Sequence, residues 1–263
     1  MLLFSSLRLV DNCGQMQTQQ SNNVGVKVVR DSEAVGRAGA DLVISELRAK
    51  PNLLLCTATG ASPTRTYELL AEESRKSPQL FKQLRILKLD EWGGLAMDDP
   101  GSCEAYLRRY VLGPLAISSD RYTGFQSEPK NPDQEATRIR QWVAEHGPID
   151  ICILGLGTNG HLAMNEPAEM LQPFAHVAEL AQTTLGHGML AAAKRKPAYG
   201  LTLGLAEIFH SERVLLLVSG SNKSQQLTRL RTQEISTQFP ASLLWLHPNV
   251  SCFCDEAAAG GKP

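Results

Sequence analysis

The sequence lacks the features that would point to a membrane or a nucleic acid. None of its hydrophobic runs approaches the length that a membrane-spanning helix requires. Its 26 basic residues are almost balanced by 27 acidic residues, so no field of one sign is available to hold nucleic acid or an anionic membrane. An anionic small-molecule substrate would therefore have to be held by a few local groups.

Paired cysteines of the C-x-x-C type are also absent. The six cysteines are scattered, and several fall in apolar, strand-like runs, which predicts buried reduced thiols and no zinc or other metal site. Arg8 interrupts the apolar opening and no basic region precedes it, so no secretory signal is expected. The sequence thus predicts a cytoplasmic protein. The cysteines are Cys13, Cys56, Cys103, Cys152, Cys252 and Cys254.

What is present is the pattern of an α/β fold. The chain has 263 residues, 43% of them hydrophobic, which is enough for one sizeable core. Short apolar runs alternate with helical patterns, and this alternation predicts a single domain with a mostly parallel, Rossmann-like central sheet flanked by helices. We expect residues 1–23 to be a disordered lead-in, residues 24–256 to form the domain and residues 257–263 to be a loose tail.

The elements of this sheet can be placed by pattern. Asp31 or Ser32 is a cap for a first helix, and Asn131 followed by Pro132 begins another that stops at Gly147. A further helix is expected from about Ser221. The predicted strands cover residues 53–57, 86–89, 149–154, 214–218 and 250–254.

Two of these strands end in sequences suited to an anion. In Thr59-Gly60-Ala61-Ser62-Pro63, small residues expose backbone N–H groups, Ser62 suits an N-cap and Pro63 suits the first helical position. In Gly220-Ser221-Asn222-Lys223, Lys223 would face the positive end of a helix dipole unless an anion were bound there. A plain capped turn and a solvated lysine are the alternatives.

Two further strand ends carry groups suited to proton transfer. Asp90-Glu91-Trp92 places an acidic pair where a desolvated carboxylate with a raised pKa could take a proton from carbon, although such pairs often only solvate a loop. The segment 155–167 matches G-x-G-x-x-G, but Pro167 leaves no room for the long helix of a dinucleotide site. Its Asn159, His161 and Glu166 instead indicate a proton shuttle.

At this loop the sequence resembles a known family. Asn159-Gly160-His161 and Asn165-Glu166-Pro167 are similar to the signature loop of the glucosamine-6-phosphate deaminases, and the other strand ends follow in that family's order. The resemblance covers about residues 25–255. Two segments, 101–104 and 242–247, look closest to the galactosamine-6-phosphate isomerase (deaminase) branch.

The resemblance implies an aldose–ketose isomerisation with release of ammonia, without cofactor or metal. Asp90 would be the base that moves a proton between C2 and C1, and His161, oriented by Asn159 and Glu166, would assist ring opening. The phosphate would be held by Lys223 and by the turn, and Glu91 would support the substrate beside the base. The residues of the turn are Thr59, Gly60, Ala61 and Ser62.

Three departures from the family pattern stand out. Asn159 is an amide where some relatives carry Asp, so it can only orient His161 by hydrogen bonding. Many relatives supply an arginine to the phosphate from the segment matching 183–187, but Leu185 occupies that place here. Arg195 or a neighbouring lysine is the expected substitute. The longer C-terminal extension of allosteric members is also missing, so no such regulation is expected.

Several alternatives stay open on sequence alone. The fold is similar to that of 6-phosphogluconolactonase, a hydrolase, and a non-enzymatic sugar-phosphate sensor is a third reading, although residues 1–23 cannot form a helix-turn-helix. The substrate would be galactosamine 6-phosphate or glucosamine 6-phosphate, and a homo-oligomer is compatible with the sequence. Four histidines could be structural or could line the sugar pocket: His176, His187, His210 and His247.

Overall fold

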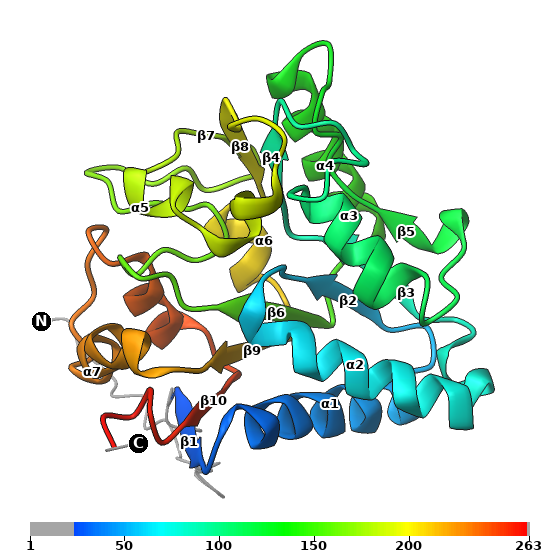
Figure 1. Ribbon diagram of the computed structural model, residues 1–263, viewed down its shortest axis with the longest axis horizontal. Helices are drawn as coiled ribbons and strands as arrows, with labels where there is room; N and C mark the ends of the chain where they lie inside the picture. The colour runs from blue at the N-terminus through cyan, green and yellow to red at the C-terminus, as the bar shows by residue number, and fades with distance from the viewer. Residues whose placement is uncertain (1–23, 262–263) are drawn as a thin grey trace, which may run out of the picture.

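Seven parallel strands form the main sheet, as the alternation of apolar runs and helices predicts (Figure 1). The computed structural model describes residues 24–261, so the predicted lead-in 1–23 lies outside the described residues. The sequence patterns missed both edge strands, residues 25–29 and 122–123. In spatial order the strands are β1 (Gly25–Val29), β10 (Val250–Asp255), β9 (Arg213–Val218), β6 (Ile151–Gly155), β2 (Leu54–Thr57), β3 (Arg85–Lys88) and β5 (Tyr122–Thr123).

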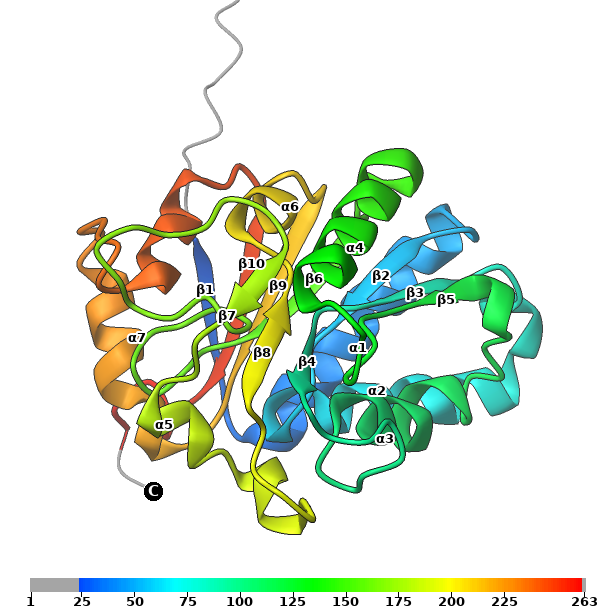
Figure 2. The same ribbon diagram turned by 90° about the horizontal axis from the view of Figure 1, so that it is seen from above.

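Helices cover both faces of this sheet. α1 (Ser32–Ala49) and α2 (Ala61–Lys76) pack against each other on one face, and Figure 2 shows α4 (Pro132–His146) and α6 (Leu205–Phe209) on the other. Two predicted starts are confirmed, since Asp31 accepts a hydrogen bond from the Ala34 N–H and Asn131 accepts one from the Gln134 N–H. Shorter helices are α3 (Cys103–Leu107), α5 (Gln182–Leu185) and α7 (Ser224–Arg231).

A second, antiparallel sheet was not expected from the sequence. β8 (Tyr199–Thr202) lies between β4 (Asp90–Gly93) and β7 (His176–Ala178), with Asp90 opposite Thr202. The predicted loop at Asp90-Glu91-Trp92 is therefore strand β4, which follows β3 after Leu89 and leaves the main sheet. Consequently, alternate side chains of this strand face opposite ways.

The core follows from the strand sequences. β2, β6 and β9 are nearly continuous apolar runs because helices cover both of their faces. The cysteines within residues 24–261 are free and buried, as expected, while Cys13 lies outside that range. No helix among the described residues is long and apolar enough to cross a membrane.

The expected loose tail is packed more closely than its composition suggests. Residues 256–260 form turns, and the side chain of Ala258 is completely buried. The Ala258 N–H donates to Asp255 Oδ1 at 2.7 Å, which ties the turn to the end of β10. The described part of this segment, up to Gly261, thus belongs to the folded unit.

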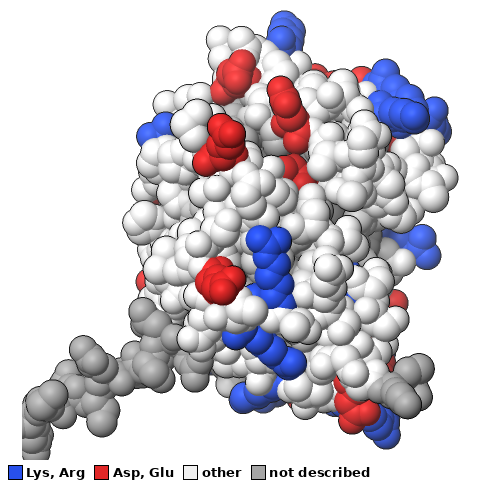
Figure 3. All heavy atoms as spheres, turned by 90° about the vertical axis from the view of Figure 1, so that its left-hand side faces the viewer, with Lys and Arg blue, Asp and Glu red and all other residues white. Residues whose placement is uncertain are grey.

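The charged groups at the surface are mixed in sign. On the face shown in Figure 3, acidic and basic side chains are interspersed among a larger uncharged area. This distribution agrees with the net charge of −1 and leaves the recognition of any anion to local groups.

A buried ion-pair cluster joins the two sheets. The fully buried Lys88 at the end of β3 contacts Glu91 Oε2 at 2.7 Å and Glu104 Oε2 at 2.9 Å. Glu104 also accepts from Tyr122 Oη at 2.5 Å and from Arg108 Nε at 2.9 Å. Burial lowers the pKa of Lys88, but the charges and hydrogen bonds of the two glutamates outweigh burial and raise that pKa above its ordinary value.

Lys88→Met tests how strongly the fold depends on this cluster. The substitution keeps most of the side-chain volume but leaves Glu91 and Glu104 buried without their shared cation, so the free energy of unfolding should fall by roughly 3–5 kcal/mol. Urea unfolding followed by circular dichroism measures it. The exposed Lys130→Met is the matched control and should change stability by less than about 0.5 kcal/mol. Equal stability of both variants would contradict a structural role for the cluster.

Candidate active site

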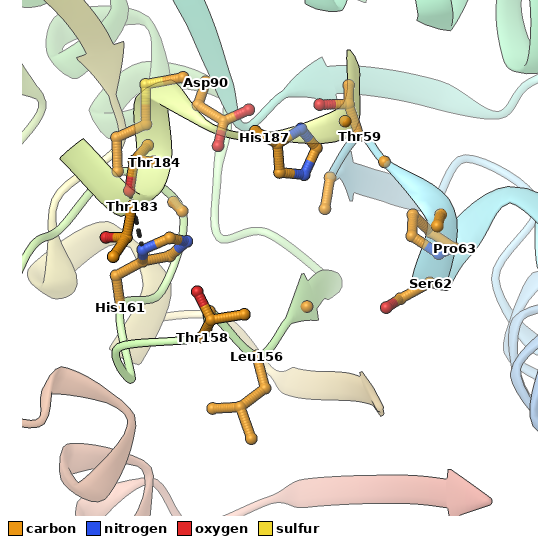
Figure 4. A pocket seen from close by; sticks show the side chains of 18 of the residues that line it. Thr59, Ser62, Pro63, Asp90, Leu156, Thr158, His161, Thr183, Thr184 and His187 are labelled. Atoms are coloured by element: carbon orange, nitrogen blue, oxygen red, sulfur yellow. Dashed lines mark hydrogen bonds between the residues drawn. The ribbon is translucent and has the colours of Figure 1, made fainter. Parts of the chain in front are cut away.

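A cavity of about 420 Å³ opens where four strands of the main sheet end. Its lining includes residues that follow the carboxyl ends of β2, β3, β6 and β9, and the chain reverses its direction of winding between β2 and β6. Ligands of open α/β sheets bind at such a switch point, and the volume suits a small metabolite. Figure 4 shows that groups from several elements point into this space.

One side of the cavity is formed by the start of α2. Helix α2 begins at Ala61 with Gly60 as its N-cap, so the prediction that Ser62 caps the helix is wrong. Gly60 has φ of +106°, a conformation that disfavours any side chain. Its carbonyl accepts from Thr64 Oγ1 at 2.8 Å and from Tyr106 Oη at 2.9 Å.

These two contacts set the direction of the next N–H group. In a trans peptide the N–H points opposite to the carbonyl, so the Ala61 N–H points away from Thr64 and Tyr106. Ala61 and Ser62 lie in the first helical turn, where N–H groups have no partner within the helix, and both line the cavity together with Thr59. The predicted turn therefore provides an anion cradle.

Lys223 also lines the cavity, from the segment that follows β9. It ends a 3₁₀ turn, Ser221–Lys223, that links β9 to α7, close to the predicted helix start. Burial lowers the pKa of its ammonium group. Among the described residues that line the cavity, Lys223 is the one lysine or arginine.

Asp90 faces the same cavity at the start of β4. Only 8% of the residue is exposed. Burial, followed by the charge of Glu91, raises the pKa of its carboxyl group to about 7, although Cys103 and Lys88 partly oppose that rise. The Cys103 thiol lies 3.8 Å from Asp90 Oδ1 and accepts from Thr59 Oγ1 at 3.3 Å. A carboxyl group titrating near neutrality is suited to moving protons.

Glu91, predicted to contact the substrate, does not line the cavity. Because side chains alternate along a strand, Asp90 and Trp92 face the cavity while Glu91 faces the interior. There it is completely buried and accepts hydrogen bonds from the backbone N–H groups of Trp92, Cys103 and Glu104 at 2.8–2.9 Å. Its role is to position β4 and α3 and to influence the charge of Asp90.

His161 lies on the loop after β6 and lines the cavity. Its Nδ1 lies 3.4 Å from Glu166 Oε2 and 3.3 Å from Thr184 Oγ1. The ring packs directly over Gly157, where a Cβ would come within 2.4 Å of His161 Cδ2. With Nδ1 held from behind, Nε2 is the nitrogen available to a ligand.

Glu166 and Asn159 support His161 from outside the cavity lining. Burial raises the pKa of Glu166, but the hydrogen bond and charge of His161, with hydrogen bonds from Thr184 and Asn159, lower it to about 2. Asn159 Nδ2 donates to Glu166 Oε2 at 2.7 Å, and Asn159 Oδ1 accepts from the His161 N–H. The amide thus orients the pair, whereas an aspartate here would place two carboxylates in contact.

The segment between β7 and β8 contributes two threonines that the sequence did not single out and His187, which the sequence left open. Thr184 Oγ1 donates to Glu166, and Thr183 and His187 line the cavity, as Figure 4 shows. These residues lie in no periodic hydrophobic pattern. The only feature of the sequence that could have pointed to them is the cluster of polar residues and glycines in Thr-Thr-x-Gly-His-Gly. Leu185 does not line the cavity.

The expected substitute for a phosphate-binding arginine is wrong. Arg195 pairs with the exposed Glu128 and, like its lysine neighbours, is absent from the cavity lining. Three of the four histidines left open, His176, His210 and His247, also lie outside it, and only His187 lines the cavity. Within residues 24–261 no group of three His, Cys, Asp or Glu side chains is arranged to hold a metal ion.

Comparison with known proteins agrees with this geometry. The family model described as glucosamine-6-phosphate isomerases/6-phosphogluconolactonase matches residues 30–252. One relative is AgaI of Escherichia coli (strain K12), which is named a deaminase on a provisional basis. It is 41% identical to this chain over 85% of this chain and 89% of its own length. The glucosamine-6-phosphate deaminase of Bacillus pumilus (strain SAFR-032) is 33% identical over 87% of this chain and 95% of its own.

Solved structures give the same result. A monomeric glucosamine-6-phosphate deaminase superposes with a TM-score of 0.86 at 30% identity, covering 90% of this chain and all of that one. The 6-phosphogluconolactonase of Trypanosoma brucei shares the fold, with a TM-score of 0.70 at 20% identity, over 90% of this chain and 98% of its own. The chain belongs to the glucosamine-6-phosphate isomerase/6-phosphogluconolactonase family.

Proposed function

We propose that this protein is an amino-sugar-6-phosphate deaminase that converts galactosamine 6-phosphate or glucosamine 6-phosphate into the ketose 6-phosphate and ammonia. The observation that carries the proposal is Asp90, a buried carboxyl group of pKa about 7 that faces the same cavity as a histidine–glutamate pair and an anion cradle. Lactone hydrolysis transfers no proton to or from carbon, whereas the isomerisation needs a base placed for that step.

The two proton-transfer groups divide the chemistry between them. His161, held at Nδ1 by Glu166, would take the C1 hydroxyl proton at Nε2 and pass it to the ring oxygen as the C1–O5 bond breaks and C1 becomes an aldehyde. Asp90 would then take the proton from C2 while the substrate's ammonium group gives a proton to O1, which forms an enolamine. Asp90 would return its proton to C1. Water adds to the resulting C2 iminium, and ammonia leaves to give the C2 ketone. The substrate's own nitrogen stabilises the charge.

The anion cradle would fix the opposite end of the open chain. A phosphate group would accept hydrogen bonds from the N–H groups at the start of α2, from Thr59 and Ser62 and from Lys223, which line one part of the cavity. Binding energy gained there holds C1 and C2 against Asp90 and His161. All of these groups lie on one chain. We include a cytoplasmic location in the proposal, since buried free thiols suit a reducing compartment.

Ammonia release tests the proposal directly. The purified protein should release ammonia from galactosamine 6-phosphate, glucosamine 6-phosphate or both, measured with a coupled ammonia assay at pH about 8, and the faster substrate identifies the C4 epimer. 6-Phosphogluconolactone is offered in parallel. Lactone hydrolysis without ammonia release would replace the deaminase by the hydrolase, and no turnover of any of the three would favour a binding protein.

Asp90→Asn tests the assigned base. The amide has the same shape but cannot accept the C2 proton, so kcat should fall by about 10²–10⁴ while the fold is kept. Single-turnover exchange of the C2 proton with solvent deuterium reports the same step. Asp98→Asn, on an exposed side chain, is the control and should behave as the unmodified protein. Near-normal turnover of the Asp90 variant would show that another group is the base.

The pH profile follows from the raised pKa of Asp90. Below about pH 7 the carboxyl group is protonated and cannot act as the base, so kcat should rise with pH through about 7 and level off above it. At pH 6 kcat should be about one tenth of the plateau. Saturating substrate removes the titration of the free phosphate from the measurement. A flat profile between about pH 5.5 and 8 would contradict the proposed role.

A further inference from the structure

The phosphate end of the cavity is short of positive charge. A phosphate monoester carries about −1.5 to −2 charges at pH 7. Among the described lining residues, Lys223 contributes one positive charge, and the start of α2 contributes about half a charge more. These two sources supply about 1.5 positive charges, so up to about half a charge of the ligand stays unbalanced. A further donor that can become partly cationic would make up this difference.

His187 is positioned to be that group. It lies on the segment between β7 and β8, and in Figure 4 its ring lies between Asp90 and Thr59. A methyl group built on Gly60 would lie 3.3 Å from its Cε1 and 3.4 Å from its Nε2, so this edge of the imidazole faces the start of α2. The opposite edge is turned away from the cradle.

A backbone contact fixes the tautomer of this ring. Nδ1 of His187 accepts a hydrogen bond from the Met189 N–H at 3.3 Å, so the neutral ring carries its proton on Nε2. The N–H donor is therefore directed at the anion cradle. Protonation would occur at Nδ1, whose lone pair Met189 holds only weakly, and would make the whole ring a cation.

Burial and neighbouring charges disfavour the protonated form of His187. Burial, then the charges of His161 on the loop after β6 and of Lys223 before α7, lower the pKa of His187. Asp90 on β4 lines the same cavity, and the start of α2 places no titratable side chain in the lining. An anion bound beside Nε2 and Lys223 would raise the pKa of His187, because its negative charge stabilises the imidazolium form.

We propose that His187 binds the substrate phosphate through Nε2 and takes up a proton as it does so, completing the cradle formed by Lys223 and α2. The inference rests on the proposed function for the identity of the phosphate ligand. Because His187 takes up a proton when the ligand binds, the affinity for the ligand should fall as pH rises.

Sulfate is the probe that isolates this linkage. It keeps its double negative charge over about pH 6–8, whereas a phosphate monoester titrates near pH 6. Asp90 lines the same cavity and its carboxyl group titrates at about pH 7, so the comparison is made in the D90N background. In D90N, isothermal titration calorimetry should show sulfate binding about tenfold tighter at pH 6 than at pH 8, because a hydrogen bond to a charged donor is stronger than one to a neutral donor. In D90N/H187Q, whose glutamine keeps an N–H donor but cannot be protonated, the difference should be less than about twofold.

A control and a second readout make the test specific to this ring. His210→Gln, made in the same background, changes an exposed histidine outside the cavity and should keep the tenfold dependence. In NMR spectra the His187 Cε1–H resonance, assigned by its loss in H187Q, should titrate at higher pH with sulfate than without. The inference is overturned if sulfate does not shift the titration of His187, or if sulfate binding to D90N/H187Q keeps the tenfold pH dependence.

The sulfate experiment requires no turnover, so its outcome is separate from that of the ammonia assay. If the protein releases no ammonia but the His187 titration responds to sulfate, the deaminase proposal fails and the anion-binding role stands. If ammonia is released but His187 ignores sulfate, only the inference about His187 fails.

Discussion

The rest of the site depends on the buried contact between Lys88 and two glutamates. Lys88 ends the main-sheet strand β3, Glu91 belongs to the second sheet and Glu104 to α3, so one ammonium group joins three elements. Unpaired charges at such depth would be costly, and the three therefore have to remain together. This constraint fixes where the chain leaves the main sheet, and that point is Asp90.

The same cluster sets the chemistry of Asp90 through the geometry of a single strand. Alternation along β4 places Asp90 against the cavity and Glu91 against Lys88, on opposite faces one residue apart. Glu91 opposes ionisation of Asp90 and Lys88 favours it, while burial disfavours it most strongly. A carboxyl group close to its point of titration at neutral pH results from this balance.

The sequence predicted what depends on local pattern. Continuous apolar runs located five strands of the main sheet, and the Asp31 and Asn131 caps located two helix starts. Glycines and polar groups after three strand ends singled out Thr59, His161 and Lys223, which all line the cavity. Glu91 was misplaced because its surroundings come from β3 and α3, and a sequence pattern does not show that its residues form a strand of a second sheet.

The residues that the sequence missed depend on contacts distant along the chain. Thr184 reaches Glu166 across 18 positions, and His187 meets Gly60 across more than a hundred. Neither residue belongs to a periodic run, so only the folded arrangement gives them partners. β1, by contrast, was missed because it is an edge strand whose residues are largely exposed and show no buried pattern.

The segment between β7 and β8 has a consequence for how such an enzyme can change. Thr183, Thr184 and His187 all come from it, yet β7 and β8 pair only with β4 and with each other, outside the main sheet. Insertions or exchanges in this stretch would alter the proposed ring-opening and anion-binding groups together while the seven-stranded sheet keeps its packing. The main sheet, on which folding depends, is thus separate from the segment between β7 and β8, whose sequence can change during evolution.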